Sequence, residues 1–270
     1  MRVARHIMPL PGYDRGLFLT RGNGMKRVVF SLVGLVLSVA TATMAFAQDP
    51  VRPKVGVIFS GCGMMDGTEV SEAVLTMLYL ERGKANVVYM APSAPQADVI
   101  NHATNKPGEG SRDVLEESAR ISRGNIVDIA NVKSGDLDAI VIVGGLGSVK
   151  NLSDFLSKGK DCTVNADVAR LIKETYAAKK PIGSMCLASA NLAKVLGKQK
   201  ITITIGGASN FVGQIEAMGA IHKQCAVGDI VVDEKNRIVT TPAMMVGPST
   251  SDMAVGIEKM IQTVLSMTKR

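Results

Sequence analysis

A cysteine placed between a short apolar run and a helical pattern is the strongest chemical signal in this sequence. Cys186 follows residues 182–185, which we expect to form a strand, and precedes residues 187–196, which have helical spacing. A nucleophile at such a turn is presented to substrate, and a helix N-terminus favours the thiolate. The pattern predicts a reactive thiol with a lowered pKa. A buried core cysteine is the alternative, because free cysteine is among the most buried residue types.

Two glycine-rich loops also follow expected strands. Gly144-Gly145-Leu146-Gly147 comes directly after the apolar run 139–143. Backbone N–H groups of such a turn can point at a developing oxyanion, although a plain turn that needs positive φ has the same composition. The second loop, residues 60–69, reads SGCGMMDGTE and leads from a strand into a helix.

This second loop supplies a carboxylate and another thiol. Glu69 lies near the start of the helix and could move protons at the site, or it could be a solvated residue that complements the helix dipole. Glu72, one turn further along, is the fallback for the same role. Cys62 is either a second site thiol or a packed small residue.

Apolar runs alternate with helical patterns along residues 55–267. This alternation predicts a doubly wound α/β domain with a mainly parallel sheet, in which sites form at the carboxyl ends of strands. We expect strands at 55–60, 86–90, 139–143, 182–185 and 201–205, a hairpin at 230–233 and 238–241, and helices at 69–82, 112–122, 167–178, 187–196, 211–218 and 251–267.

Composition and charge limit the classes of partner. The chain has 270 residues, of which 46% are hydrophobic and 20% charged, which is an ordinary globular composition. Its net charge is +7, but residues 1–47 hold six basic side chains and one acidic one, so the remainder is nearly neutral. Aromatic residues make up 4%. The sequence therefore predicts no nucleic-acid partner.

The N-terminal segment has the pattern of an export signal. A Met-Lys-Arg tripeptide begins at Met25, residues 28–47 carry no charge, and a small-x-small triplet ends at Ala47. We predict a secretory signal peptide within residues 1–47, with Met25 as the initiator, and a periplasmic or secreted domain at 48–270 without stable membrane insertion. An uncleaved membrane span is the alternative.

The four cysteines do not form a metal-binding pattern. Cys62, Cys162, Cys186 and Cys225 include no CxxC pair, and three complete disulfide pairings stay open. His102 and His222 are the histidines that follow residue 47. We therefore expect neither a structural zinc site nor a cofactor.

Seven segments together resemble the ThiJ/PfpI superfamily, which is related to class I glutamine amidotransferase domains. The most similar branch is the ElbB type, called isoprenoid-biosynthesis-associated or glyoxalase-like. The segments span about residues 53–265 and are VGVIFSGCGMMDGTEVSEAVLT, ADVINHAT, RDVLEESARISRGNI, LDAIVIVGGLGSVKNLSDF, CTVNADV, KPIGSMCLASANLAKVL and VGDIVVDEKNRIVTTPAMM.

The resemblance implies a flavodoxin-like three-layer sandwich and assigns roles to single residues. Cys186 would be the reactive thiol, and Glu69 the carboxyl that contacts it. The backbone N–H groups of Gly145 and Leu187 would be oxyanion donors. Because many members of the superfamily dimerise, a homodimer is also implied.

Two departures from the superfamily pattern narrow the activity. Protease-like members have His directly after the nucleophile, where this sequence has Leu187, and the downstream His-x-Glu pair of amidotransferases is absent. Both departures argue against peptidase activity and glutamine hydrolysis. His222 is the candidate for a missing partner, although a structural role fits it better.

Two functions follow from these residues. The first is a cofactor-independent glyoxalase III-like lyase, which converts small 2-oxoaldehydes such as methylglyoxal and glyoxal to hydroxy acids through a hemithioacetal on Cys186. The alternative is a non-enzymatic, redox-responsive stress or interaction protein that uses the same cysteine.

Overall fold

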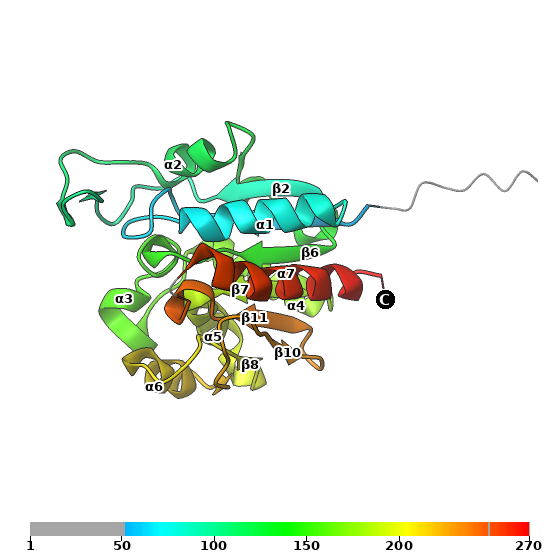
Figure 1. Ribbon diagram of the computed structural model, residues 1–270. Helices are drawn as coiled ribbons and strands as arrows, with labels where there is room; N and C mark the ends of the chain where they lie inside the picture. Colours follow the sequence, from blue (N-terminus) through cyan, green and yellow to red (C-terminus); the bar gives the residue numbers. More distant parts are fainter. Residues whose placement is uncertain (1–51, 248, 270) are drawn as a thin grey trace, which may run out of the picture. The chain divides into compact units, whose positions relative to one another are not determined.

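Short apolar runs of the sequence form a seven-stranded central sheet (Figure 1). The computed structural model describes residues 52–247 and 249–269, so the predicted initiator Met25 and the predicted cleavage after Ala47 lie outside the described residues. In spatial order the strands are β10 (Val231–Asp233), β11 (Ile238–Thr241), β7 (Ile182–Met185), β6 (Ala139–Ile142), β1 (Lys54–Ile58), β2 (Asn86–Ala91) and β5 (Val127–Asp128).

Neighbouring strands of this sheet are parallel, except for the antiparallel pair β10 and β11 at one edge. Strands β1 and β6 are buried along nearly their whole length, which explains why they read as continuous apolar runs. The fold is the predicted flavodoxin-like α/β sandwich with a mainly parallel sheet.

Helices cover both faces of the sheet. Gly183 of β7 faces Val264 and Met260, whereas the hydroxyl of the next residue, Ser184, accepts a hydrogen bond from the Ser189 hydroxyl at 3.3 Å. Successive residues of a strand point to opposite faces, so the helices that hold these partners lie on opposite sides. The helices are α1 (Val70–Arg82), α2 (Val114–Ile121), α3 (Phe155–Lys158), α4 (Ala166–Ala177), α5 (Ser189–Leu196), α6 (Asn210–Ala217) and α7 (Thr250–Met267).

On one face, α1 and α7 pack side by side, and on the other α4 packs against α5 (Figure 1). Each of the helices predicted from the sequence is present within a few residues of its expected bounds. No helix among residues 52–247 and 249–269 combines the length and apolarity that a bilayer crossing requires.

The predicted strand at 201–205 differs from the structure. Only β8 (Thr202–Ile203) forms, and it pairs with β9 (Ile221–His222) in a small sheet outside the central one. A second two-stranded sheet consists of β3 (Ile100–Asn101) and β4 (Lys106–Pro107). Side chains take the backbone donors of this segment: the Thr202 N–H bonds Asp233 Oδ2 at 2.7 Å, and the Thr204 N–H bonds Thr240 Oγ1 at 2.9 Å. These donors are therefore not used in a strand ladder.

Two glycine-rich loops interlock at the carboxyl edge of the sheet. The Glu69 N–H bonds the Gly144 carbonyl at 3.0 Å, and the Gly147 N–H bonds the Gly67 carbonyl at 2.9 Å. A Cβ atom on Gly147 would lie 2.6 Å from the Ser60 carbonyl oxygen and equally close to the Gly67 carbonyl carbon. Only a residue without a side chain permits this approach of the two loops.

We expect Gly147→Ala to destabilise the protein by about 1–3 kcal/mol, because the new methyl group meets backbone atoms that cannot rotate away. Gly213→Ala in α6 is the matched control, since a Cβ there meets nothing within 4 Å. The control should be neutral or stabilising by up to about 1 kcal/mol. Urea unfolding of both variants measures the difference, and equal stabilities would contradict the close approach.

Candidate active site

Cys186 occupies a strained turn where β7 ends. The short 3-10 helix η5 (Cys186–Ala188) begins there, and α5 follows at once. Cys186 has a φ of 55°, a left-handed value that is uncommon for a residue with a side chain. Such outliers persist where the surrounding structure imposes them and cluster at functional sites. The predicted strand-to-helix turn is present, but the cysteine is only 6% exposed.

Three groups contact the buried sulfur. The backbone N–H groups of Gly145 and Leu187 lie near it and lower its pKa, and the carboxyl group of Glu72 lies beside it. Gly144 closes another side, since a Cβ on this glycine would lie 3.2 Å from the sulfur. The thiol therefore has a polar shell, with little room for water.

Burial raises the pKa of the Cys186 thiol well above its usual range, and the nearby Glu72 charge acts in the same direction. The two backbone N–H groups lower this pKa, but their effect is smaller. The expectation of a lowered pKa is therefore wrong. Loss of hydration penalises the thiolate by more than the oriented N–H groups stabilise it.

Glu72 of α1 is a fully buried carboxyl group. Its Oε1 accepts a hydrogen bond from the Met244 N–H at 3.1 Å. Its Oε2 has no hydrogen-bond partner among the residues that the structure describes. The Cys186 thiol lies beside this oxygen. Burial, with a smaller contribution from the charge of Glu69, raises the pKa of Glu72 from 4.5 to about 8. Near neutral pH the carboxyl is thus mostly protonated.

Glu69 has a different position from the one we expected. It is the N-cap of α1, and its Oε2 accepts the Glu72 N–H at 2.6 Å. The structure brings Glu72 rather than Glu69 to the thiol, because capping turns the Glu69 carboxylate back onto its own helix. Glu69 fixes the first turn of the helix that presents Glu72.

The other predicted residues lie apart from the thiol–carboxyl pair. Cys62 makes a backbone bridge to Thr68, and burial raises its pKa. His222 lies on β9, where its Nε2 accepts the Ile205 N–H at 3.2 Å. Burial lowers the pKa of His222. The neutral His222 ring therefore accepts a hydrogen bond that holds the segment after β8 in place.

His102 forms hydrogen bonds to the backbone, and the cysteines form no disulfide bonds. The His102 Nε2 accepts the Met65 N–H at 3.1 Å, and its Nδ1 donates to the Ile100 carbonyl at 3.1 Å. All four cysteines are free thiols. In the described part of the chain, His, Cys, Asp and Glu side chains form no group of three that could hold a metal ion.

Sequence reasoning missed the contribution of the segment after β11. There a 3-10 helix, η7 (Ala243–Met245), begins at Ala243, whose φ is 45°. This turn directs the Met244 N–H at Glu72. A backbone donor leaves no trace in residue type, and only the adjacency of β11 and β7 brings it to the site.

A mainly parallel sheet with a cysteine at the strand-to-helix turn, two backbone donors and a buried glutamate defines an amidotransferase-like α/β domain. The chain is 44% identical over 223 residues to the human mitochondrial glutamine amidotransferase-like class 1 domain-containing protein 3, covering 80% of this chain and 83% of that protein. It is 43% identical over 225 residues to the mitochondrial ES1 protein homolog of Rattus norvegicus, covering 80% of this chain and 85% of that protein.

Solved structures agree with these relatives. The structure of an isoprenoid biosynthesis protein with an amidotransferase-like domain, from Ehrlichia chaffeensis, matches with a TM-score of 0.75 and 36% identity. The match covers 80% of this chain and 99% of that one. No family model matches the chain.

The chain belongs to the ES1 family of glutamine amidotransferase-like class 1 domain proteins. The predicted resemblance is confirmed at this level. The prediction of a signal peptide and of a periplasmic or secreted protein is wrong, because the curated relatives are named as mitochondrial proteins. An uncharged N-terminal stretch alone does not distinguish between destinations.

The raised pKa of Glu72 makes stability depend on pH. Below about pH 4.5 this carboxyl is neutral in both the folded and the unfolded chain. Between pH 4.5 and about 8 the unfolded chain loses the proton while the folded protein keeps it, so folding stability falls as pH rises. We expect Glu72→Gln to remove this loss, which is on the order of a few kcal/mol at pH 8.

Urea unfolding of wild type and Glu72→Gln at several pH values between 4.5 and 8.5 measures the effect. Glu81→Gln, an exposed change on the same helix, is the control and should follow wild type at every pH. A stability difference between wild type and Glu72→Gln that does not grow with pH would show that Glu72 ionises normally in the folded protein.

Proposed function

We propose that this protein converts small 2-oxoaldehydes, such as methylglyoxal and glyoxal, to hydroxy acids without a cofactor. Cys186 is the nucleophile, and Glu72, not Glu69, is the carboxyl group that accepts and donates protons. The observation that carries the proposal is the buried pair of Cys186 and Glu72, whose sulfur and carboxyl oxygen both lie beside the Gly144 backbone, with the N–H groups of Gly145 and Leu187 nearby.

The reaction needs a nucleophile and a group that moves protons. The ionised Glu72 accepts the thiol proton as the sulfur attacks the aldehyde carbon, C1, and passes it to the aldehyde oxygen, which gives a hemithioacetal beside the C2 carbonyl. Glu72 then removes the C1 hydrogen as a proton, which leaves an enediol, and delivers it to C2. The C1 hydroxyl proton passes to the C2 oxygen, so C1 is oxidised to a thioester and C2 is reduced to an alcohol. Water hydrolyses the resulting thioester, which releases the hydroxy acid and restores the thiol.

The same pair suits proton transfer because its members share one low-dielectric environment. A pKa of about 8 for Glu72 lies close to physiological pH, where a group can both accept and release a proton. The N–H groups of Gly145 and Leu187 belong to fixed backbone turns. They can therefore stabilise the negative charge that develops on the aldehyde oxygen without a rearrangement of the backbone.

The enclosure of the sulfur favours a small substrate. Cys186 is 6% exposed, and the Gly144 backbone and the Glu72 carboxyl flank it. Two- and three-carbon aldehydes need the least room beside the sulfur. A peptide or a glutamine substrate fits the site less well, and Cys186 has Glu72 rather than a histidine as its partner.

The redox alternative receives less support. Peroxide reacts with thiolates, and burial raises the pKa of Cys186. A slow reaction with peroxide is the expectation for such a thiol. The names of the relatives favour a mitochondrial setting over an exported one for either function.

Lactate formation from methylglyoxal by the purified protein tests the proposal. We expect Cys186→Ser and Glu72→Gln each to reduce kcat/KM by about 100-fold or more, because one removes the nucleophile and the other the proton acceptor. Cys225→Ser is the control, since this half-exposed thiol lies outside the site, and it should retain full activity.

The pH profile separates a catalytic Glu72 from a structural one. The rate should rise as pH increases through about 8, because the ionised carboxylate is the form that accepts the thiol proton. Wild-type protein that forms no lactate, or Cys186→Ser protein that forms it at the wild-type rate, would refute the proposed function.

A further inference from the structure

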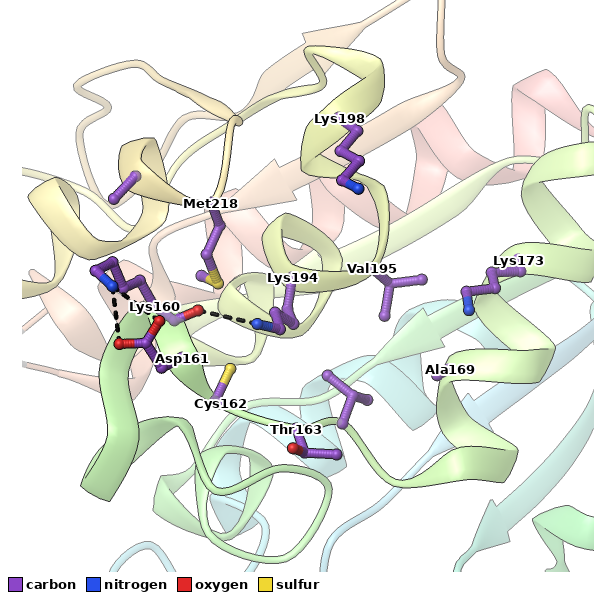
Figure 2. Close-up of a pocket in the computed structure, with 12 residues that line it drawn as sticks. Lys160, Asp161, Cys162, Thr163, Ala169, Lys173, Lys194, Val195, Lys198 and Met218 are labelled. Atoms are coloured by element: carbon purple, nitrogen blue, oxygen red, sulfur yellow. Dashed lines mark hydrogen bonds and ion pairs between the residues drawn. The ribbon is translucent and has the colours of Figure 1, made fainter.

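We propose that a lysine-rimmed hollow on the surface of the domain binds a small organic phosphate, at a site separate from Cys186. The hollow lies between α4, α5, the end of α6 and the 3-10 helix η4 (Gly159–Asp161). Figure 2 shows the lysine side chains around it: Lys160 from η4, Lys173 from α4, Lys194 from α5 and Lys198 from the 3-10 helix η6 (Gly197–Gln199) that follows α5. None of the residues that form the thiol–carboxyl site lines it.

The size and lining of the hollow suit a small ligand. Its volume is about 920 Å³, within the range of small-molecule sites, about 300–1,000 Å³. The lining combines charged side chains with an apolar surface. The residues that contribute to it are Lys160, Asp161, Cys162, Thr163, Val164, Ala169, Lys173, Lys194, Val195, Lys198, Ala217 and Met218.

The charge of the lining is strongly one-sided. Four lysines face one carboxylate, that of Asp161, and both of its oxygens lie 2.8 Å from the Lys160 Nζ. Lys173 and Lys198 form no ion pair with any described residue. Because the protein body is otherwise nearly neutral, this local excess of positive charge attracts an anion to one place.

Lys194 lies at the centre of this group (Figure 2). Its Nζ donates a hydrogen bond to the Lys160 carbonyl at 2.9 Å, which leaves its other two N–H groups for a ligand. The carbonyl fixes the ammonium group without neutralising it. A positioned ammonium loses less side-chain entropy when it binds a phosphate oxygen.

The rest of the lining indicates what the anion is attached to. Val164, Val195 and Met218 supply apolar surface beside the lysines, and the Cys162 side chain is buried beneath them. An apolar body carrying a phosphate group complements both parts. A nucleic acid fits less well, because no aromatic side chain lines the hollow for base stacking.

Isothermal titration with phenyl phosphate, at about 0.15 M salt, tests this site. We expect saturable binding at one site per chain, tighter than that of inorganic phosphate because of the apolar surface. Lys173→Gln combined with Lys198→Gln should weaken binding about tenfold, because two of the four ammonium groups are lost. Lys223→Gln combined with Lys235→Gln, which removes the same charge from exposed positions elsewhere, should change affinity less than about twofold.

Four results would overturn the proposal. They are no saturable binding of phenyl phosphate, equal losses in the two double variants, inorganic phosphate binding as tightly as phenyl phosphate, or tighter binding of a single-stranded RNA oligomer that displaces phenyl phosphate and is weakened in the Lys173→Gln, Lys198→Gln variant. Lactate formation from methylglyoxal is not part of the readout. The phosphate site can therefore fail or succeed independently of the proposed function.

Discussion

The contact between the Glu72 carboxyl and the Cys186 thiol is the constraint on which the rest of the site depends. Burial raises the pKa of both groups, and the charge of an ionised Glu72 raises the pKa of the Cys186 thiol further. The Met244 N–H donates to one carboxyl oxygen of Glu72, and the N–H groups of Gly145 and Leu187 lower the pKa of the thiol by less than burial raises it.

The order of the sheet explains how these groups meet. Strands β11, β7, β6 and β1 are consecutive neighbours, and the carboxyl end of each contributes to the site. β11 leads to the Met244 donor, β7 to Cys186 and β6 to the Gly144-Gly145 turn, while β1 leads through the 60–69 loop to α1 and Glu72. Close packing of Gly147 on the 60–69 loop fixes the start of α1 relative to the thiol.

The sequence was sufficient for the parallel sheet, the glycine turns and the cysteine turn, because these depend on local patterns. It was not sufficient for the face of α1. The apolar residues Val70, Val74 and Leu78 are exposed, whereas the carboxyl group of Glu72 lies on the buried side of this helix, so residue type does not indicate which side faces the site. Whether Glu69 or Glu72 reaches the sulfur depends on helix rotation, which is set by the N-cap and by packing between distant segments. The pKa of the thiol likewise depends on burial, which is a property of the whole fold and not of the local strand-to-helix pattern.

Infrared difference spectroscopy of the Glu72 carboxyl tests most directly whether Glu72 is protonated beside Cys186. Wild type should show the C=O stretch of a protonated carboxylic acid at neutral pH that is absent in Glu72→Gln, and this band should disappear as pH rises through about 8. A wild-type spectrum at pH 7 that shows no such band would mean that Glu72 is already ionised beside Cys186, and the account would be contradicted.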